Sequence, residues 1–81
     1  MGQAFVKIDL HGMRQDEAIK VINRAIAAAD TTTYQIQLIH GYNRGTAIRT
    51  MIYDEYSNGR HNRVKNVRGG FNEGITELVL R

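Results

Sequence analysis

Alternating hydrophobic residues predict four β-strands along the chain. Residues 5–10, FVKIDL, place three aliphatic side chains on one face, and residues 34–39, YQIQLI, repeat the alternation. A period of two is typical of a strand with one buried face. Residues 63–68, RVKNVR, and 75–80, ITELVL, are predicted to be two further strands, joined by the glycine-rich turn GGFNEG.

Two other segments have hydrophobic residues at helical spacing. The first covers residues 14–29, where apolar side chains gather on one side of the predicted helix and polar side chains on the other. This is the pattern of an amphipathic helix. The second covers residues 46–56 and is followed by Asn58-Gly59, a typical C-terminal stop. Its inward-facing residues are predicted to be Ile48, Met51, Ile52 and Tyr56.

The element order βαβαββ predicts an α/β fold, a two-layer sandwich with a four-stranded mixed sheet and two helices. A chain of 81 residues is too short for two separate cores, so residues 1–81 are predicted to form a single domain. A strand–helix–strand unit of this length joins parallel strands in most folds. We therefore expect residues 5–10 and 34–39 to run parallel, with their carboxyl ends at the same edge of the sheet.

The composition excludes several classes of protein. The chain has no cysteine, which excludes disulfide scaffolds and thiolate metal sites. No apolar run approaches the length of about 20 residues that spans a bilayer, so we expect no membrane partner and a cytoplasmic location. The net charge is +3, and its excess lies in residues 42–81, with seven basic and four acidic side chains. That distribution fits either a polyanion-binding patch or a solvated surface. The oligomeric state stays open.

The segment HGYNRGTAIR, residues 40–49, has the composition of a phosphate-binding turn. Gly41 and Gly45 permit close approach of the backbone, and the helix that follows presents unpaired N–H groups to an anion. Arg44 and Arg49 would add charge-assisted contacts. A plain strand-to-helix turn explains the same glycines, so the composition alone leaves both interpretations open.

Aspartate and histidine are the candidate acid–base residues. Asp9 and His11 are two positions apart and share one face of the strand end, where a carboxylate can orient an imidazole for proton transfer. His40 follows the second strand, at the same expected edge. Structural hydrogen bonds are the alternative for both histidines. A zinc site formed by His11, His40 and His61 lacks ligand spacing, so neither a divalent metal nor another cofactor is predicted.

Three motifs together resemble the small MutS-related (Smr) domain family. They are DLHG at residues 9–12, HGYNRGTAIR at 40–49 and GGFNEGITELVL at 69–80, in the family's order and spacing across nearly the whole chain. The resemblance implies an α/β sandwich like the C-terminal domain of the third bacterial translation initiation factor. It also implies nucleic-acid binding and, as in several members, endonuclease activity on DNA or RNA.

The resemblance also implies roles for individual residues. The Asp and His of the first motif, which family members implicate in cleavage, correspond to Asp9 and His11. The matching residues of the second and third motifs are His40, Gly41, Gly45, Arg49, Gly69, Gly70 and Gly74. Asn43 stands where the second motif usually has its middle glycine. Asparagine tolerates the left-handed backbone conformation better than most residues, so the turn is expected to survive.

We predict a nucleic-acid-binding domain with endonuclease activity, in which Asp9, His11 and His40 are catalytic. The residues predicted to contact phosphate or nucleic acid are Gly41, Asn43, Arg44, Gly45, Arg49, Arg60, Arg63, Lys65, Arg68, Gly69 and Gly70. One alternative is a binding-only module of a larger DNA-repair, recombination or ribosome-associated protein. Another is a site for a small phosphorylated metabolite. The choice between DNA and RNA stays open.

Overall fold

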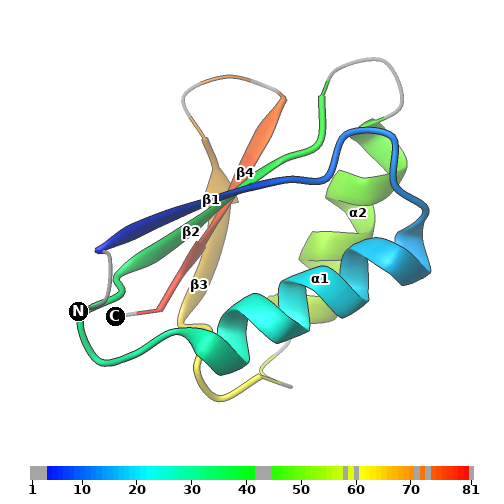
Figure 1. Ribbon diagram of the computed structural model, residues 1–81. Helices are drawn as coiled ribbons and strands as arrows, with labels where there is room; N and C mark the ends of the chain where they lie inside the picture. The colour runs from blue at the N-terminus through cyan, green and yellow to red at the C-terminus, as the bar shows by residue number, and fades with distance from the viewer. Residues whose placement is uncertain are drawn as a thin grey trace.

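A mixed β-sheet forms one layer of the molecule and a pair of helices forms the other (Figure 1). The computed structural model describes residues 4–41, 45–57, 59, 61–70, 72 and 74–80. Within these residues the elements are β1 (Phe5–Asp9), α1 (Gln15–Ala28), β2 (Gln35–Ile39), α2 (Gly45–Tyr56), β3 (Asn66–Gly69) and β4 (Ile75–Val79). The predicted fold class and element order are confirmed.

The strands lie in the order β1-β2-β4-β3. β1 and β2 are parallel, as predicted, with Phe5 opposite Gln35, and β4 runs antiparallel to both of its neighbours. This topology brings the carboxyl ends of β1 and β2 to the same edge as the turn between β3 and β4, at the top of Figure 1. We call this edge the carboxyl edge. It comprises residues 10–12 and 40–41 together with Gly70, Asn72 and Gly74.

The helices pack on one face of the sheet and bury the aliphatic side chains that the alternation places there. Leu10, Ile36, Leu38 and Leu78 have no exposed surface. The buried residues that the two helices contribute are Ala18, Ile22, Ile26, Ile48, Met51, Ile52 and Tyr56. The inward-facing residues predicted for α2 are therefore confirmed.

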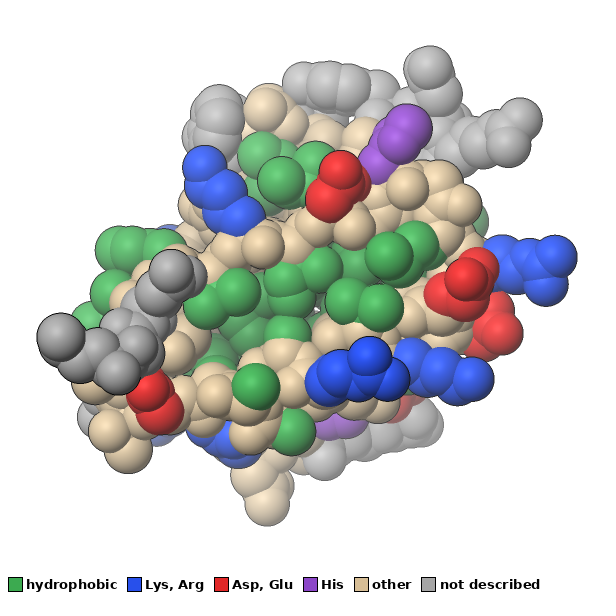
Figure 2. All heavy atoms as spheres, in the orientation of Figure 1, with side chains coloured by type: hydrophobic (Ala, Val, Ile, Leu, Met, Phe, Trp, Pro, Cys, Tyr) green, Lys and Arg blue, Asp and Glu red, His purple; other side chains and the backbone are tan. Residues whose placement is uncertain are grey.

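β1 is an edge strand, and this position limits how deeply its side chains are buried. Val6 and Ile8 pack against the core but stay partly exposed. Figure 2 shows hydrophobic side chains at the surface in the strip between β1 and α1. Burial along β1 becomes complete only at Leu10, whose backbone N–H donates to the Ile39 carbonyl at 2.7 Å.

Two local contacts position the helices. The backbone N–H of Arg14 donates to the Glu17 carboxylate at 3.2 Å, which satisfies a donor at the start of α1. The Tyr56 hydroxyl, at the end of α2, donates to the side-chain oxygen of Asn23 on α1 at 2.7 Å. Burial, with the negative charge of Glu55 added, raises the pKa of Tyr56 to about 12. The phenol therefore remains a donor at all physiological pH values.

The third strand is shorter than predicted, because it begins at Asn66 and not at residue 63. The backbone N–H of Val64 donates to the His61 carbonyl at 3.0 Å, so this segment forms a turn and not a strand. Val64 is nevertheless buried at 8% exposure. The alternating pattern thus predicted that Val64 faces inward, although its backbone N–H pairs within a turn and not with a strand.

We expect Gly70→Ala to destabilise the fold more than Gly69→Ala. A Cβ at Gly70 would lie 2.5 Å from Cγ2 and 3.0 Å from the carbonyl oxygen of Ile75, while a Cβ at Gly69 would meet no atom within 4 Å. Overpacking of this kind costs about 1–3 kcal/mol. An open surface site changes stability by about 0.5 kcal/mol or less. Urea unfolding of the two variants measures the difference, and equal losses would contradict the predicted clash.

Candidate functional site

Two glycine-containing segments are tied together at the carboxyl edge. The carbonyl oxygen of Gly74, just before β4, accepts the backbone N–H groups of His40 at 2.9 Å and Gly41 at 3.1 Å. The backbone N–H of Gly74 itself donates to the Asn72 side chain at 2.8 Å. The third motif therefore holds the second motif in place through its backbone.

Gly41 is the point where the first and second motifs touch. Its φ of +81° lies in the left-handed region, which side chains disfavour by about 1–2 kcal/mol. A Cβ at this position would lie 3.1 Å from Cδ2 of the His11 imidazole. A Cβ at Gly74 would lie 3.4 Å from the Gly41 Cα. Both the backbone conformation and the crowding explain why glycine occupies position 41.

His11 is exposed on a tight turn that ends β1. The Met13 N–H donates to the Leu10 carbonyl at 3.0 Å, and Gly12 has a φ of +79°. Since no described residue other than glycine has a positive φ, this is a type II turn with His11 at its second position. Asp9 Oδ1 accepts the His11 backbone N–H at 2.9 Å.

The role of Asp9 thus differs from the one that the sequence suggested. We predicted that its carboxylate orients the His11 ring, whereas the hydrogen bond in the structure fixes the His11 backbone. The His11 ring lies beside Gly41, at the place where a side chain at that position would begin. The imidazole is left exposed at the carboxyl edge, where it can reach a bound molecule.

His40 is buried, at 3% exposure, and both of its ring nitrogens have partners. Nδ1 lies 3.1 Å from the Gly41 carbonyl oxygen, and Nε2 lies 2.8 Å from the Thr76 hydroxyl. A carbonyl oxygen can only accept, so Nδ1 carries the proton, and in the neutral ring Nε2 accepts from the Thr76 hydroxyl. The neutral imidazole of His40 therefore has a single tautomer.

The electrostatics of the site favour the same protonation state. Burial lowers the pKa of His40 below its ordinary value of 6.5, and the positive charge of Arg49 lowers it further. The hydrogen bond to the Gly41 carbonyl opposes these effects only in part. A neutral, buried ring with a hydrogen-bond partner at each nitrogen is suited to positioning the backbone. The role of proton carrier, which the sequence suggested for His40, does not fit these surroundings.

α2 begins at Gly45, directly after the carboxyl edge. Arg49 lies on the exposed surface near its start, and its charge acts on His40. Asn43 and Arg44, and also Arg60 farther along the chain, lie outside the described residues.

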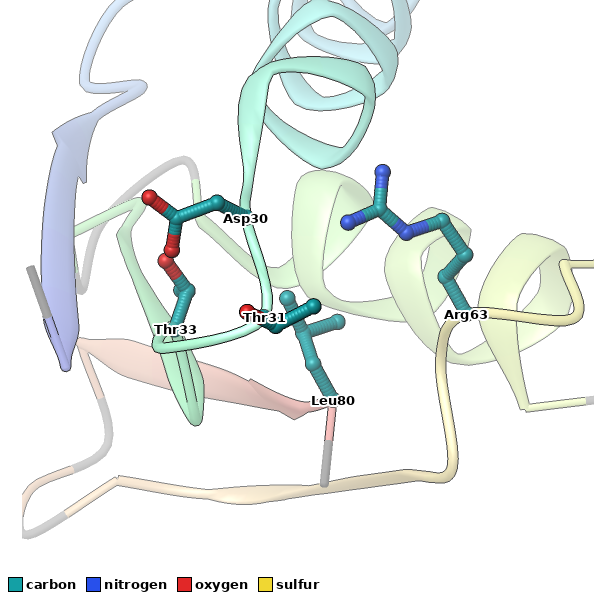
Figure 3. A pocket seen from close by; sticks show the side chains of 5 residues that line it. All are labelled: Asp30, Thr31, Thr33, Arg63 and Leu80. Carbon is teal, nitrogen blue, oxygen red and sulfur yellow. The ribbon is translucent and has the colours of Figure 1, made fainter. Parts of the chain in front are cut away.

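The other predicted basic contacts are not gathered at the carboxyl edge. Arg63 donates to the Ile26 carbonyl at 2.7 Å and to the Ala29 carbonyl, so it caps the C-terminal end of α1 (Figure 3). The Lys65 backbone pairs with Val79, at the opposite end of the sheet. The structure thus brings together Asp9, His11, His40, Gly41, Gly69 and Gly70, with Arg49 near enough for its charge to act on His40, and separates Arg63 and Lys65 from them.

Arg68 lies in the middle of β3, on the sheet face away from the helices. Its Nε donates to Glu77 Oε1 at 2.9 Å. Gly69 and Gly70 follow at the carboxyl edge, where the Gly70 N–H donates to the Ile75 carbonyl at 2.8 Å. These two glycines therefore shape the turn beside the site.

Thr76 is a site residue that the sequence reasoning missed. It occupies an inward position of β4, between aliphatic residues, and is fully buried. A hydroxyl at an otherwise apolar inward position was the available signal, because a buried polar group requires a partner. Its partner is the His40 ring.

The described residues contain no cluster of three or more His, Cys, Asp or Glu side chains able to hold a metal ion. Neither of the two described helices has the length and apolar character that crossing a membrane requires.

We expect Gly41→Ala to be more disruptive than Gly12→Ala. Both glycines have φ near +80°, so each variant carries a similar conformational cost of about 1–2 kcal/mol. Only Gly41 also has the His11 ring within 3.1 Å of the added Cβ, whereas nothing lies within 4 Å at Gly12. Unfolding free energies and the NMR signals of the His11 ring measure the difference. An unchanged His11 signal in Gly41→Ala would contradict the contact.

We expect the contribution of His40 to stability to depend on pH. Because the pKa of the folded state lies below 6.5, the unfolded chain binds more protons near and below that pH. The stabilisation is therefore complete above about pH 6.5 and is lost as the pH falls toward the lowered pKa of the folded state. The difference in unfolding free energy between the wild type and His40→Gln should shrink from about pH 7.5 to about pH 5.5, one unit on either side of the ordinary pKa. A constant difference would contradict the neutral assignment.

Comparisons with known proteins agree with this geometry. The Smr domain family matches residues 8–75, which include the first two motifs and most of the third. The crystal structure of the Smr domain of Thermus thermophilus MutS2 superimposes with a TM-score of 0.80 and 26% sequence identity, covering 94% of this chain and 98% of that chain. No curated protein matches the chain. The chain therefore belongs to the Smr domain family, a nuclease-related family of nucleic-acid-binding domains.

Proposed function

We propose that the carboxyl edge binds a backbone phosphate of DNA or RNA and that His11 catalyses cleavage of the phosphodiester bond. The observation that carries the proposal is the exposed His11 ring packed against Gly41, next to the start of α2. This arrangement places an imidazole, which can transfer protons, beside the backbone of Gly41. Because glycine has no side chain, a phosphate can approach that backbone closely. The family supports nucleic acid as the ligand.

In this proposal the phosphate contacts Gly41 and the first turn of α2. The N–H groups at a helix start carry partial positive charge and suit an anion. Arg49, whose charge already acts on the neighbouring His40, adds a full positive charge there. Such a charge stabilises the negative charge on the phosphoryl oxygens as the water attacks phosphorus.

His11 acts as the general base in this scheme. It accepts a proton from the attacking water as the new P–O bond forms, and the P–O bond to the leaving oxygen breaks. The leaving oxygen takes a proton from solvent, which balances the hydrolysis. Asp9 holds the His11 backbone and His40 holds Gly41, so both serve as positioning residues.

Nicking of supercoiled plasmid and cleavage of single-stranded RNA test the proposal. Loss of a general base lowers the rate by about 10²–10⁴-fold, and we expect this loss in His11→Ala with nucleic-acid binding retained. Comparable rates in the wild type and His11→Ala would remove His11 from the mechanism. The plasmid and RNA arms also show which nucleic acid is cleaved.

Two arginine variants test the phosphate site separately. Arg49→Ala should weaken binding and make the slope of log K against log salt shallower by about 0.7–0.9, the effect of one lost phosphate contact. Arg24→Ala removes another exposed arginine, from α1, and should leave the slope unchanged. Equal slopes in the two variants would place the phosphate elsewhere.

A binding-only module is the second candidate function, favoured by one observation. The Asp9 carboxylate bonds the His11 backbone, so the ring lacks the carboxylate orientation that many histidine bases use. Salt-sensitive binding by the wild type without any cleavage would establish this alternative.

A further inference from the structure

The sheet face opposite the helices carries features that the proposed cleavage site does not explain. Both helices lie on the other side of the sheet (Figure 1), so outward side chains of all four strands share this uncovered face. Among the described residues, Phe5 at 58% and Tyr34 at 53% are the exposed large hydrophobic side chains. Both lie at the amino end of the parallel pair β1 and β2.

These two aromatic residues border a shallow hollow. Its other lining residues are Gln35, Val79 and Arg68. The strand register explains the grouping, because Phe5 pairs with Gln35 and Gln35 pairs with Val79 in one row across the sheet. The hollow therefore combines aromatic rings with an amide and a guanidinium.

A second row across the same face is polar. The register pairs Lys7 with Gln37, Gln37 with Glu77, and Glu77 with Arg68. Glu77 is buried at 8% exposure and accepts from Gln37 at 3.3 Å and from Arg68 at 2.9 Å. The Arg68 side chain is still 57% exposed, and Lys7 is exposed. The charges that this row presents to solvent are thus positive.

We propose that this uncovered face is a stacking platform for the bases of a single-stranded nucleic acid, with one base held against Phe5. Exposed aromatic rings on a sheet, accompanied by cations, bind unpaired bases because every base offers a flat face for stacking. Lys7 and Arg68 then contact the phosphates through their positive charges. A duplex keeps its bases stacked on each other and cannot use the ring in this way.

The direction of β1 connects the platform to the cleavage site, and this part of the inference rests on the proposed function. The strand leads from Phe5 through Lys7 to Asp9 and then to His11. The four residue steps from Phe5 to Asp9 span about 13 Å, and His11 follows two residues later. This distance corresponds to about four nucleotides at a spacing of about 3.4 Å in a stacked strand. The platform would therefore make the domain prefer single-stranded segments over duplex.

Binding of one labelled oligonucleotide, alone and annealed to its complement, tests the platform. A length of about 12 nucleotides fits the site sizes of single-strand binders. We expect Phe5→Ala to weaken binding of the single strand about tenfold, within the contribution of one stacked base. Binding of the duplex should stay the same. Phe5→Leu keeps an apolar side chain without the ring, and it should behave like Phe5→Ala.

A fluorescent variant adds an independent measurement. The chain contains no tryptophan, so Phe5→Trp places a single reporter in the hollow. Stacking predicts quenching by the single strand and none by the duplex. Circular dichroism and thermal unfolding check that each variant folds, as expected for a side chain with 58% exposure.

The outcomes separate the platform from the cleavage site. Arg49→Ala should lose affinity for both oligonucleotides, whereas Phe5→Ala should lose affinity for the single strand alone. Equal single-strand binding by the wild type and Phe5→Ala overturns the platform and leaves the carboxyl edge intact. If the wild type binds neither oligonucleotide, both proposals fail. Binding of an apolar peptide at Phe5, in place of the oligonucleotide, would identify a protein-docking face and overturn the platform as well.

Discussion

The carbonyl oxygen of Gly74 is the acceptor on which the carboxyl edge depends. It takes the backbone N–H groups of both His40 and Gly41, and so joins the start of β4 to the end of β2. This junction fixes the left-handed conformation of Gly41 and leaves room for the His11 ring against it. The first and third motifs of the chain meet at the second, although more than sixty residues separate His11 from Gly74 in the sequence.

The two histidines at this edge have opposite surroundings and therefore different uses. His40 is buried between the Gly41 carbonyl and the Thr76 hydroxyl, and its lowered pKa keeps it neutral. His11 stands exposed on a turn. A buried ring with two fixed partners contributes rigidity, while an exposed ring can exchange protons with a bound molecule. His40 is therefore a supporting residue, and His11 is the histidine that the proposed cleavage requires.

The basic residues show that sequence proximity and spatial proximity differ in a small sheet protein. Arg63 completes the end of α1, Arg68 joins the Glu77 network on the uncovered face, and Arg49 is left near the glycines. Only part of the positive charge is therefore available to the carboxyl edge. Arg68 lies instead on the uncovered face, which also carries the exposed side chains of Phe5 and Lys7.

Periodicity along the chain determined the elements and their inward faces, because burial against a single core imposes a period on each strand and helix. The parallel pairing of β1 and β2 followed from the connection between them, which is why Asp9, His11, His40 and Gly41 could be assigned to one edge in advance. Tertiary structure alone decided that the His40 ring bonds to the Thr76 hydroxyl and that Arg63 caps a helix, whereas Asp9 accepts from the N–H of His11, only two residues away. Each of these outcomes depends on which donor or acceptor comes within about 3 Å of a side chain. Partners from distant segments acquire that proximity only when the layers pack together.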